Sequence, residues 1–182
     1  MDGPEFRLNC GAPWLDLLAT LNGRLAPPPT ELLDSPRRLG DWFAAAGCTP
    51  SRAPNDDDLL AARTLREALY TLAHGLLEGR APDPAAVRTV NAAAAADTGF
   101  ALRTKGGELA ATRPGNSTGA LARLARQAID TLTGPSRLRL RSCDDATCAG
   151  IYLDDTGRRR WCSDRRCGSR ARVRAHRARQ SQ

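Results

Sequence analysis

The sequence predicts an α+β fold that is mostly helical, in which a helical N-terminal domain over residues 1–136 precedes a smaller module over residues 137–182. Leucines and alanines recur at helical spacing in the first 136 residues, whereas four of the six cysteines fall between residues 143 and 167. Charge changes at the same boundary, because residues 1–136 have a net charge of −1 and residues 137–182 hold 13 arginines and five aspartates, a net charge of +8. We expect the two segments to have different roles.

Composition excludes several classes of protein. With 182 residues, of which 41% are hydrophobic and 26% charged, the chain is expected to be globular, and no apolar run reaches the roughly 18 residues of a membrane-spanning helix. The first ten residues contain acids and a proline where a signal peptide would have a basic start and an apolar core. These features favour a cytoplasmic protein without membrane association.

Apolar residues at helical spacing predict five helices in the first domain. The clearest is a long amphipathic helix that follows Asn55 and three aspartates, since negative side chains stabilise a helix N-terminus. The expected helices cover residues 12–25, Pro36 to near Gly47, Asp56 to Gly79, Asp83 through the alanine run that follows Val90, and Ser117 or Thr118 to Gly134.

One small β-hairpin is expected in the helical domain. Its strands would cover residues 100–104 and 108–112, and the turn between them is Lys105-Gly106-Gly107. This hairpin is the only β element predicted for residues 1–136.

Four cysteines have the spacing of a metal site: Cys143, Cys148, Cys162 and Cys167 form two Cys-x4-Cys pairs separated by thirteen residues. Each pair can chelate one side of an ion, and four thiolates match the tetrahedral preference of Zn2+. The x4 gap is wider than the commonest x2 gap, so spacing alone leaves other ligand arrangements open. A closed four-thiolate site has no open position for catalysis, and we therefore predict one structural zinc ion.

The remaining residues of the module predict how the cysteine pairs are brought together. Residues 137–141 alternate polar and apolar as a half-buried strand does, and residues 151–153 and 158–161 are expected to form a hairpin about a turn at 154–157. A helix capped by Ser163 or Asp164 would run to about Arg179 and carry Cys167 in its first turn. Together these elements resemble a treble-clef or ribbon-like zinc module with four cysteine ligands that ends in a basic helix.

The final helix is rich in arginine, which predicts a polyanionic partner. Like charges at i and i+4 destabilise an isolated helix, so neutralisation by nucleic acid would stabilise it. Double-stranded DNA is the partner we expect, with Arg170, Arg174 and Arg177 as first candidates for contacts and Arg166 and Arg172 next. A solvated basic tail is the alternative interpretation. RNA is a further alternative, although only Tyr152 and Trp161 are available here for stacking on unpaired bases.

The segment WCSDRRCGSRARVRAHR, residues 161–177, resembles the CGNR zinc finger of bacterial proteins, in which four cysteines bind zinc and a Cys-Gly-Asn-Arg tetrad opens a basic helix. The resemblance implies that the four cysteines are the zinc ligands and that Gly168 and Arg170 match the tetrad. Ser169 stands where the family has asparagine.

The helical segment is similar to the ABATE domain, which precedes the CGNR finger in bacterial proteins grouped as stress-induced transcription regulators. The residues that carry this looser similarity are the stretch LREALYTLAHGLLEG and the opening from Leu15 to Asn22. The resemblance implies a DNA-binding transcriptional regulator that is not an enzyme, whose first domain senses a ligand or forms a homodimer.

Two other functions remain open at the level of sequence. One is a small-ligand-binding protein or an enzyme with its site in the helical domain and a purely structural zinc finger; Asp16, Asn22 and Asn91 are the polar residues that could contact a small-molecule effector. Capping or backbone hydrogen bonding is the alternative role for these three residues. The other function is an RNA- or ribosome-associated zinc protein. Cys10 and Cys48 are expected to be inert thiols.

Overall fold

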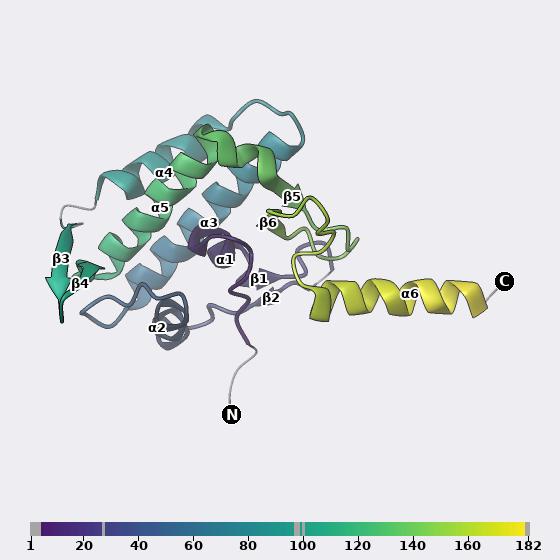
Figure 1. The fold of residues 1–182 in the computed structure, drawn as a ribbon, viewed down its shortest axis with the longest axis horizontal. Coiled ribbons are helices and arrows are strands. Elements are labelled where there is room, and N and C mark those ends of the chain that lie inside the picture. Colours follow the sequence, from purple (N-terminus) through teal and green to yellow (C-terminus); the bar gives the residue numbers. More distant parts are fainter. Residues whose placement is uncertain (1–4, 27, 97–98, 100, 181–182) are drawn as a thin grey trace. The chain divides into compact units, whose positions relative to one another are not determined.

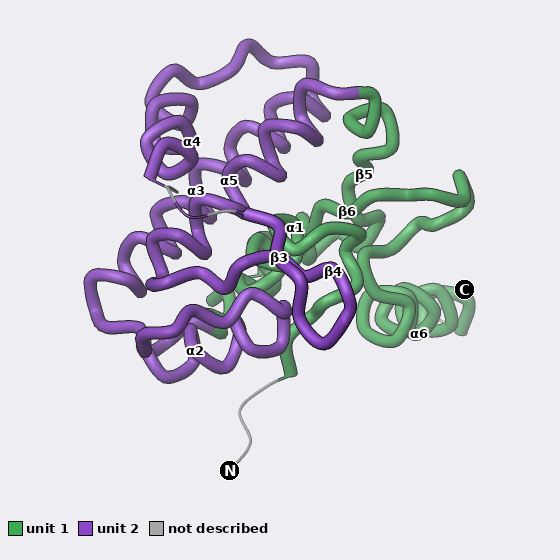
Figure 2. Tube along the Cα trace, turned by 60° about the vertical axis from the view of Figure 1, so that its left-hand side comes forward, with its two compact units in different colours: residues 1–32, 135–182 green, residues 33–134 purple. Residues whose placement is uncertain are grey.

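The structure is a computed structural model that describes residues 5–26, 28–96, 99 and 101–180. The chain forms two compact units, shown in Figure 2: unit 1 combines residues 1–32 with residues 135–182, and unit 2 comprises residues 33–134. The sequence analysis divides the chain at residue 136 and places residues 1–32 with the helices. In space, this N-terminal segment instead belongs to the compact unit that contains the cysteine-rich module.

Unit 2 is built on helices whose apolar faces pack together. It contains α2 (Pro36–Ala45), α3 (Asp56–Leu77), α4 (Pro84–Ala95) and α5 (Ser117–Thr133), and Figure 1 shows their order. Helices α3, α4 and α5 pack against one another, and α2 packs against α3. Leu39, Leu69 and Leu124 are among the buried side chains at helical spacing that form this core.

Polar caps fix where these helices begin. Ser35 accepts a hydrogen bond from the Arg38 N–H at the start of α2, and Asn55 and Asp58 form a reciprocal capping box at the start of α3. The cap of α5 is Asn116, whose Oδ1 accepts from the Gly119 N–H at 2.9 Å, and the helix begins at Ser117, one of the two residues predicted to open it. An asparagine in extended conformation one residue earlier supplies the acceptor, so Ser117 is already helical.

The predicted hairpin of unit 2 is present as β3 (Leu102–Lys105) and β4 (Glu108–Ala111). Lys105 pairs with Glu108 across a turn in which both central glycines have positive φ, +60° and +84°. Phe100, which the sequence analysis places at the start of the first strand, lies outside the described residues.

Unit 1 begins with a shorter helix than predicted. The expected helix over residues 12–25 ends at Leu18, so α1 is Pro13–Leu18. The Thr20 hydroxyl donates to the Leu17 carbonyl at 2.7 Å, and the chain then turns at Gly23, where φ is +64°. Strand β1 (Leu21–Asn22) pairs antiparallel with β2 (Thr30–Glu31). This second β element was not predicted, because the leucines of residues 12–25 have helical spacing.

The C-terminal half of unit 1 has the predicted zinc-module architecture with two local differences. A short 3₁₀ helix, Pro135–Arg139, replaces most of the strand expected over residues 137–141, and β5 is Leu140–Ser142. Strand β6 (Ile151–Leu153) pairs with β5, in the register Ser142 to Ile151, and not with residues 158–161, which form a loop. The chain therefore reverses direction through residues 143–150, a loop that contains Cys143, Cys148 and Gly150.

The module ends in a π-helical turn, η2 (Asp164–Gly168), followed by the basic helix α6 (Ser169–Gln180). Ser163 caps this turn, because its hydroxyl oxygen accepts a hydrogen bond from the Arg166 N–H. Ser163 is one of the two residues that were predicted to cap this helix. Within the described ranges, none of the helices has the length and apolar character needed to cross a membrane.

Candidate metal centre and nucleic-acid interface

The four cysteines predicted as ligands lie together in unit 1. Cys143 follows β5, Cys148 precedes β6, Cys162 ends the loop after β6, and Cys167 lies in η2; all four are buried, with their sulfurs within 4.8 Å of one another. Three of the sulfur pairs are separated by 3.4, 3.5 and 3.6 Å. Sulfurs around a zinc ion with bonds of about 2.3 Å stand roughly 3.8 Å apart, so this cluster has the size of a tetrahedral zinc–tetrathiolate site.

A glycine lets the backbone approach this cluster. A Cβ on Gly150 would lie 2.9 Å from Sγ of Cys162 and 3.1 Å from Sγ of Cys148, so only glycine fits without displacing a ligand. A Cβ on Gly168 would lie 2.5 Å from Oδ1 of Asp164. Gly168, the glycine that matches the family tetrad, thus lies against side chains of its own segment and not against a sulfur.

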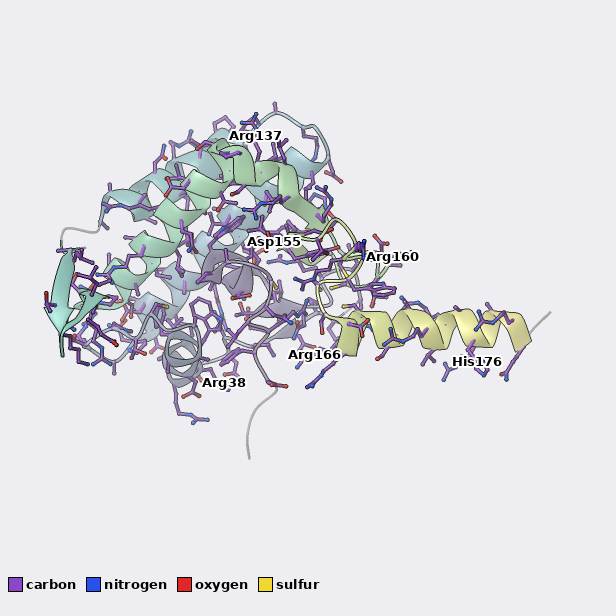
Figure 3. All side chains as sticks on the ribbon, in the orientation of Figure 1. Arg38, Arg137, Asp155, Arg160, Arg166 and His176 are labelled. Atoms are coloured by element: carbon purple, nitrogen blue, oxygen red, sulfur yellow. The ribbon has the colours of Figure 1, made fainter. Side chains whose placement is uncertain are left out.

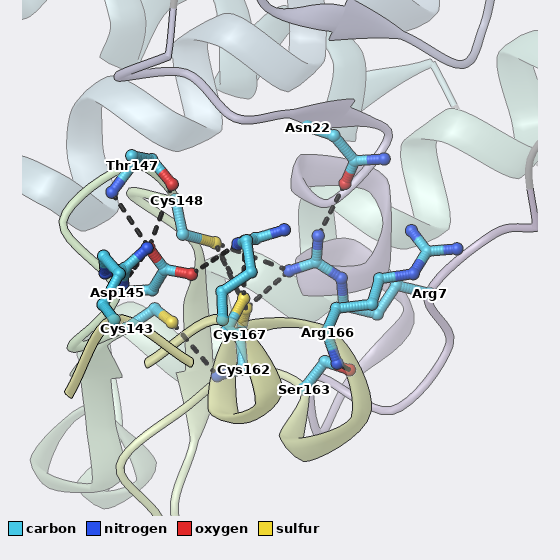
Figure 4. Close-up of polar contacts among 12 residues, drawn as sticks. Arg7, Asn22, Cys143, Asp145, Thr147, Cys148, Cys162, Ser163, Arg166 and Cys167 are labelled. Carbon is cyan, nitrogen blue, oxygen red and sulfur yellow. Dashed lines mark hydrogen bonds and ion pairs between the residues drawn. The ribbon is translucent and has the colours of Figure 1, made fainter. Parts of the chain in front are cut away.

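Arginines at the start of α6 are fixed to the metal centre through a buried carboxylate (Figure 4). Nε of Arg170 lies 2.8 Å from Asp145, and its Nη2 lies 3.2 Å from Sγ of Cys167. Arg174 donates to the other Asp145 oxygen at 2.9 Å. Burial opposes the charged carboxylate, but hydrogen bonds from the Thr147 N–H and from both arginines lower the pKa of Asp145 to about 2. The first two turns of α6 are therefore tied to the residues between Cys143 and Cys148.

Asp145 was missed in the sequence analysis, which treated the arginines as neutralised only by an external polyanion. The signal was present, because an acid between two ligands precedes a helix with arginines at spacing i and i+4. Each of the two arginines that share Asp145 remains about half exposed, with 48% of the Arg170 side chain and 47% of the Arg174 side chain accessible. Internal pairing thus accounts for part of their charge and leaves part of each guanidinium facing solvent.

The other predicted contact residues differ in their surroundings. Arg166 donates to the Glu5 carbonyl at 3.0 Å, and Arg172 forms an ion pair with the exposed Asp164 at 3.0 Å. No residue of α6 is buried, and Arg177 is exposed near its end. Figure 3 shows side chains extending from all sides of α6, with Arg166 just before it and His176 along it.

A second basic element lies in the loop before Cys162. Arg158, Arg159, Arg160 and Trp161 line a hollow of about 380 Å³, together with Asn9 and Asp164. The guanidinium of Arg160 lies 5.3 Å from the Trp161 ring centroid, and that of Arg172 lies 6.0 Å from it. The sequence analysis assigned residues 158–161 to a strand and did not consider them as contacts for nucleic acid.

The N-terminal segment is attached to the module along its length. The carbonyls of Glu5, Asn9 and Cys10 accept hydrogen bonds from the Arg166 side chain, the Arg159 side chain and the Leu153 N–H respectively. Between these points, Nη1 of Arg7 lies 2.5 Å from Sγ of Cys162 (Figure 4). Nothing in the sequence signals these contacts, because the residues that they join are separated by about 140 positions or more and belong to no periodic pattern.

The three residues considered as ligand contacts are divided between the two units. Asp16 is buried in α1 of unit 1, where its carboxylate accepts from the Cys10 N–H at 2.8 Å, and Asn22 accepts from Arg7 at 2.5 Å. Burial raises the pKa of Asp16, although that hydrogen bond opposes the shift. Asn91 belongs to unit 2. Asp16 thus has the backbone hydrogen bond of the alternative interpretation, whereas Asn22 accepts from a side chain.

Asn91 does line a cavity within unit 2. The cavity has a volume of about 340 Å³, lies among α3, α4 and α5, and is lined mainly by apolar side chains: Leu72, Leu76, Pro82, Val87, Val90, Ile129 and Leu132, with Arg80, Asn91 and Thr133.

The two remaining cysteines are not placed for reaction. Burial raises the pKa of the Cys10 thiol to about 12 and that of the Cys48 thiol to about 11. Both are free thiols.

Comparison with known families agrees with this architecture. The ABATE family model, described as "Putative stress-induced transcription regulator", matches residues 11–135, and the CGNR zinc finger model matches residues 139–180. No curated protein sequence matches the chain. The zinc-finger match and the four close sulfurs together confirm the prediction of one structural zinc ion bound by the cysteines of unit 1.

Proposed function

We propose that this chain, which belongs to the ABATE family and ends in a CGNR zinc finger, is a transcription regulator that binds double-stranded DNA through α6. The observation that carries the proposal is the way α6 is held. Its first turns are fixed to the zinc centre by Arg170 and Arg174, yet none of its residues is buried. A helix that is rigidly attached and fully accessible is suited to inserting into the major groove of DNA.

Charge supports a polyanionic partner. Helix α6 carries five arginines and no acid, and the whole module remains basic after zinc binding, since four thiolates and one Zn2+ leave only two negative charges. Phosphates would relieve the repulsion between arginines on the same helix. A solvated tail would explain the charge but not the buried Asp145 that holds two of these arginines in place.

The arginines are proposed to act in two groups. Arg170 and Arg174 position the helix and offer their exposed N–H groups to phosphate. Arg172, between them, and Arg177, near the end of the helix, contact base edges or phosphates, and Arg166 contributes near the start of the helix. The loop arginines Arg158 and Arg160, beside Trp161, form an additional phosphate contact. The proposal includes no catalytic step.

Selection of genomic DNA fragments by the zinc-loaded chain, at near-physiological salt with total RNA as competitor, tests this function. Recovery of fragments that share one sequence is the expected result. Recovery of random DNA would reduce the module to a charge-driven anchor, and loss of all DNA to the competitor would favour RNA as the partner.

The cavity in unit 2 favours a second role for the ABATE domain. We propose that it binds a small, mainly apolar effector, whose one polar group is hydrogen-bonded by Asn91. The apolar dye 1-anilinonaphthalene-8-sulfonate is a suitable probe. Its fluorescence should rise with the parent chain and fall when Val90→Phe fills the cavity; equal fluorescence with both chains, each shown to be folded by circular dichroism, would contradict this role.

A further inference from the structure

Arg7 is a partly buried cation that faces the zinc ligands from the opposite end of the chain. Its Nη1 lies 2.5 Å from Sγ of Cys162 and 3.8 Å from Sγ of Cys148, and its Nη2 donates to Oδ1 of Asn22 at 2.5 Å. Among the described residues, Nε of Arg7 has no hydrogen-bond partner, and no carboxylate forms an ion pair with this guanidinium. Among the described residues, the sulfurs are therefore the only groups in hydrogen-bond contact with this guanidinium that can carry negative charge.

A guanidinium in this position requires a charged partner. Burying an unpaired charge is unfavourable, and neutral thiols would not compensate it. Four thiolates around one Zn2+ carry two negative charges, and two arginines reach their sulfurs: Arg7 at Cys162 and Cys148, and Arg170 at Cys167. Two guanidinium groups would neutralise the metal centre.

We infer that Arg7 is a positioning residue of the zinc centre, which neutralises the Cys162 and Cys148 thiolates and couples retention of the metal to docking of residues 5–22. Hydrogen bonds from N–H groups to thiolates disfavour their protonation and slow their release from the metal. Because the same side chain binds Asn22, and the carbonyls of Glu5 before it and Asn9 after it bind the module, the metal and the N-terminal segment stabilise each other. Coupling of this kind is reciprocal.

Substitution of Arg7 tests the first half of this coupling. Loss of an interaction with the ligands of a metal typically weakens binding about 10–100-fold, and we expect Arg7→Gln to weaken zinc binding to this extent in competition with a chromophoric chelator. Arg7→Lys keeps the positive charge but cannot contact the Cys162 sulfur and Asn22 with two separate N–H groups of a guanidinium. The zinc affinity of this variant should therefore be intermediate. Arg103→Gln is the control, because it removes an exposed arginine on β3 of unit 2 and should leave zinc affinity unchanged.

Removal of zinc from the unmodified chain tests the second half without any substitution. Hydrogen exchange of residues 8–16 should accelerate in excess chelator, because the Leu153 N–H to Cys10 carbonyl bond and the Arg7 contacts are lost, while α3 and α5 keep their protection. Zinc affinity of Arg7→Gln within about twofold of the parent chain, or unchanged exchange of residues 8–16 after zinc removal, would overturn the inference.

Discussion

The two units are stabilised in different ways. Unit 2 is one continuous stretch of chain whose leucine and alanine faces bury each other, with Leu39, Trp42 and Leu69 fully buried. Unit 1 is assembled from both ends of the chain, with short strands and helices around a cluster of cysteines, and polar contacts join its two segments. Hydrophobic packing therefore holds unit 2, whereas unit 1 combines buried apolar side chains, such as Trp14, Leu15 and Ile151, with a metal centre and its hydrogen bonds. The two units should respond to different perturbations.

The largest difference is expected on loss of zinc. Cys162→Ser should abolish zinc binding and unfold unit 1, because structural zinc contributes on the order of 10–16 kcal/mol to the folding of small zinc modules. Unit 2 should stay folded. Hydrogen exchange and metal content provide the measurement, and residues 8–16 should lose protection together with residues 140–168.

Cys48→Ser is the matched control for this variant, since Cys48 is a free thiol of unit 2. It should keep zinc and the exchange pattern of the parent chain. Full zinc content in Cys162→Ser, or unfolding confined to residues 137–182 with residues 8–16 still protected, would contradict the assembly described for unit 1.

A cavity in the core of unit 2 should have the opposite effect, destabilising unit 2 and leaving unit 1 with its zinc. Leu69 on α3 is fully buried, and Leu69→Ala should lower the free energy of unfolding of unit 2 by about 2–5 kcal/mol without loss of zinc. Leu60 lies on the same helix but is 66% exposed, so Leu60→Ala should change stability by about 0.5 kcal/mol or less. Denaturant unfolding followed beside zinc content distinguishes the two units, and equal effects of the two substitutions would refute the assignment of the core.

A smaller effect is expected from crowding the metal centre. Gly150→Ala would place a Cβ 2.9 Å from Sγ of Cys162 and 3.1 Å from Sγ of Cys148, which should cost about 1–3 kcal/mol and weaken zinc binding. Gly115→Ala serves as the control, because a Cβ there meets open space. Chelator competition measures both variants. Parent-like zinc affinity in Gly150→Ala would show that the backbone does not approach the sulfurs as closely as described.

The same contrast explains which features the sequence predicted. The helices of unit 2 were predicted almost completely, because apolar periodicity and the residue types that favour helix ends are local signals. The four cysteines were predicted because their spacing is itself a signature. The short α1, the β1–β2 pair and the partner of β6 were missed, since each depends on where the chain turns and not on periodicity.

The contacts that complete the metal centre were the least predictable. Arg7 and Asp145 act through residues from other segments, and a single arginine in the first ten residues has no pattern that would connect it to Cys162. The arginines of α6 were correctly placed on a helix beside the cysteines. Their pairing with a buried carboxylate could not be inferred from their spacing alone, because the spacing indicates a face but not its partner.

Salt dependence of duplex DNA binding tests most directly whether α6 is the nucleic-acid interface. Affinity is measured by fluorescence anisotropy over a range of salt for the zinc-loaded parent chain, for Arg172→Gln/Arg177→Gln and for Arg103→Gln, which removes an exposed arginine on β3 of unit 2. If both α6 arginines contact phosphate, the slope of log affinity against log salt should become shallower by about 1.8 in the double variant, at about 0.9 for each contact. The control should bind as the parent does. A parent chain that binds without salt dependence, or a double variant indistinguishable from Arg103→Gln, would contradict the proposal.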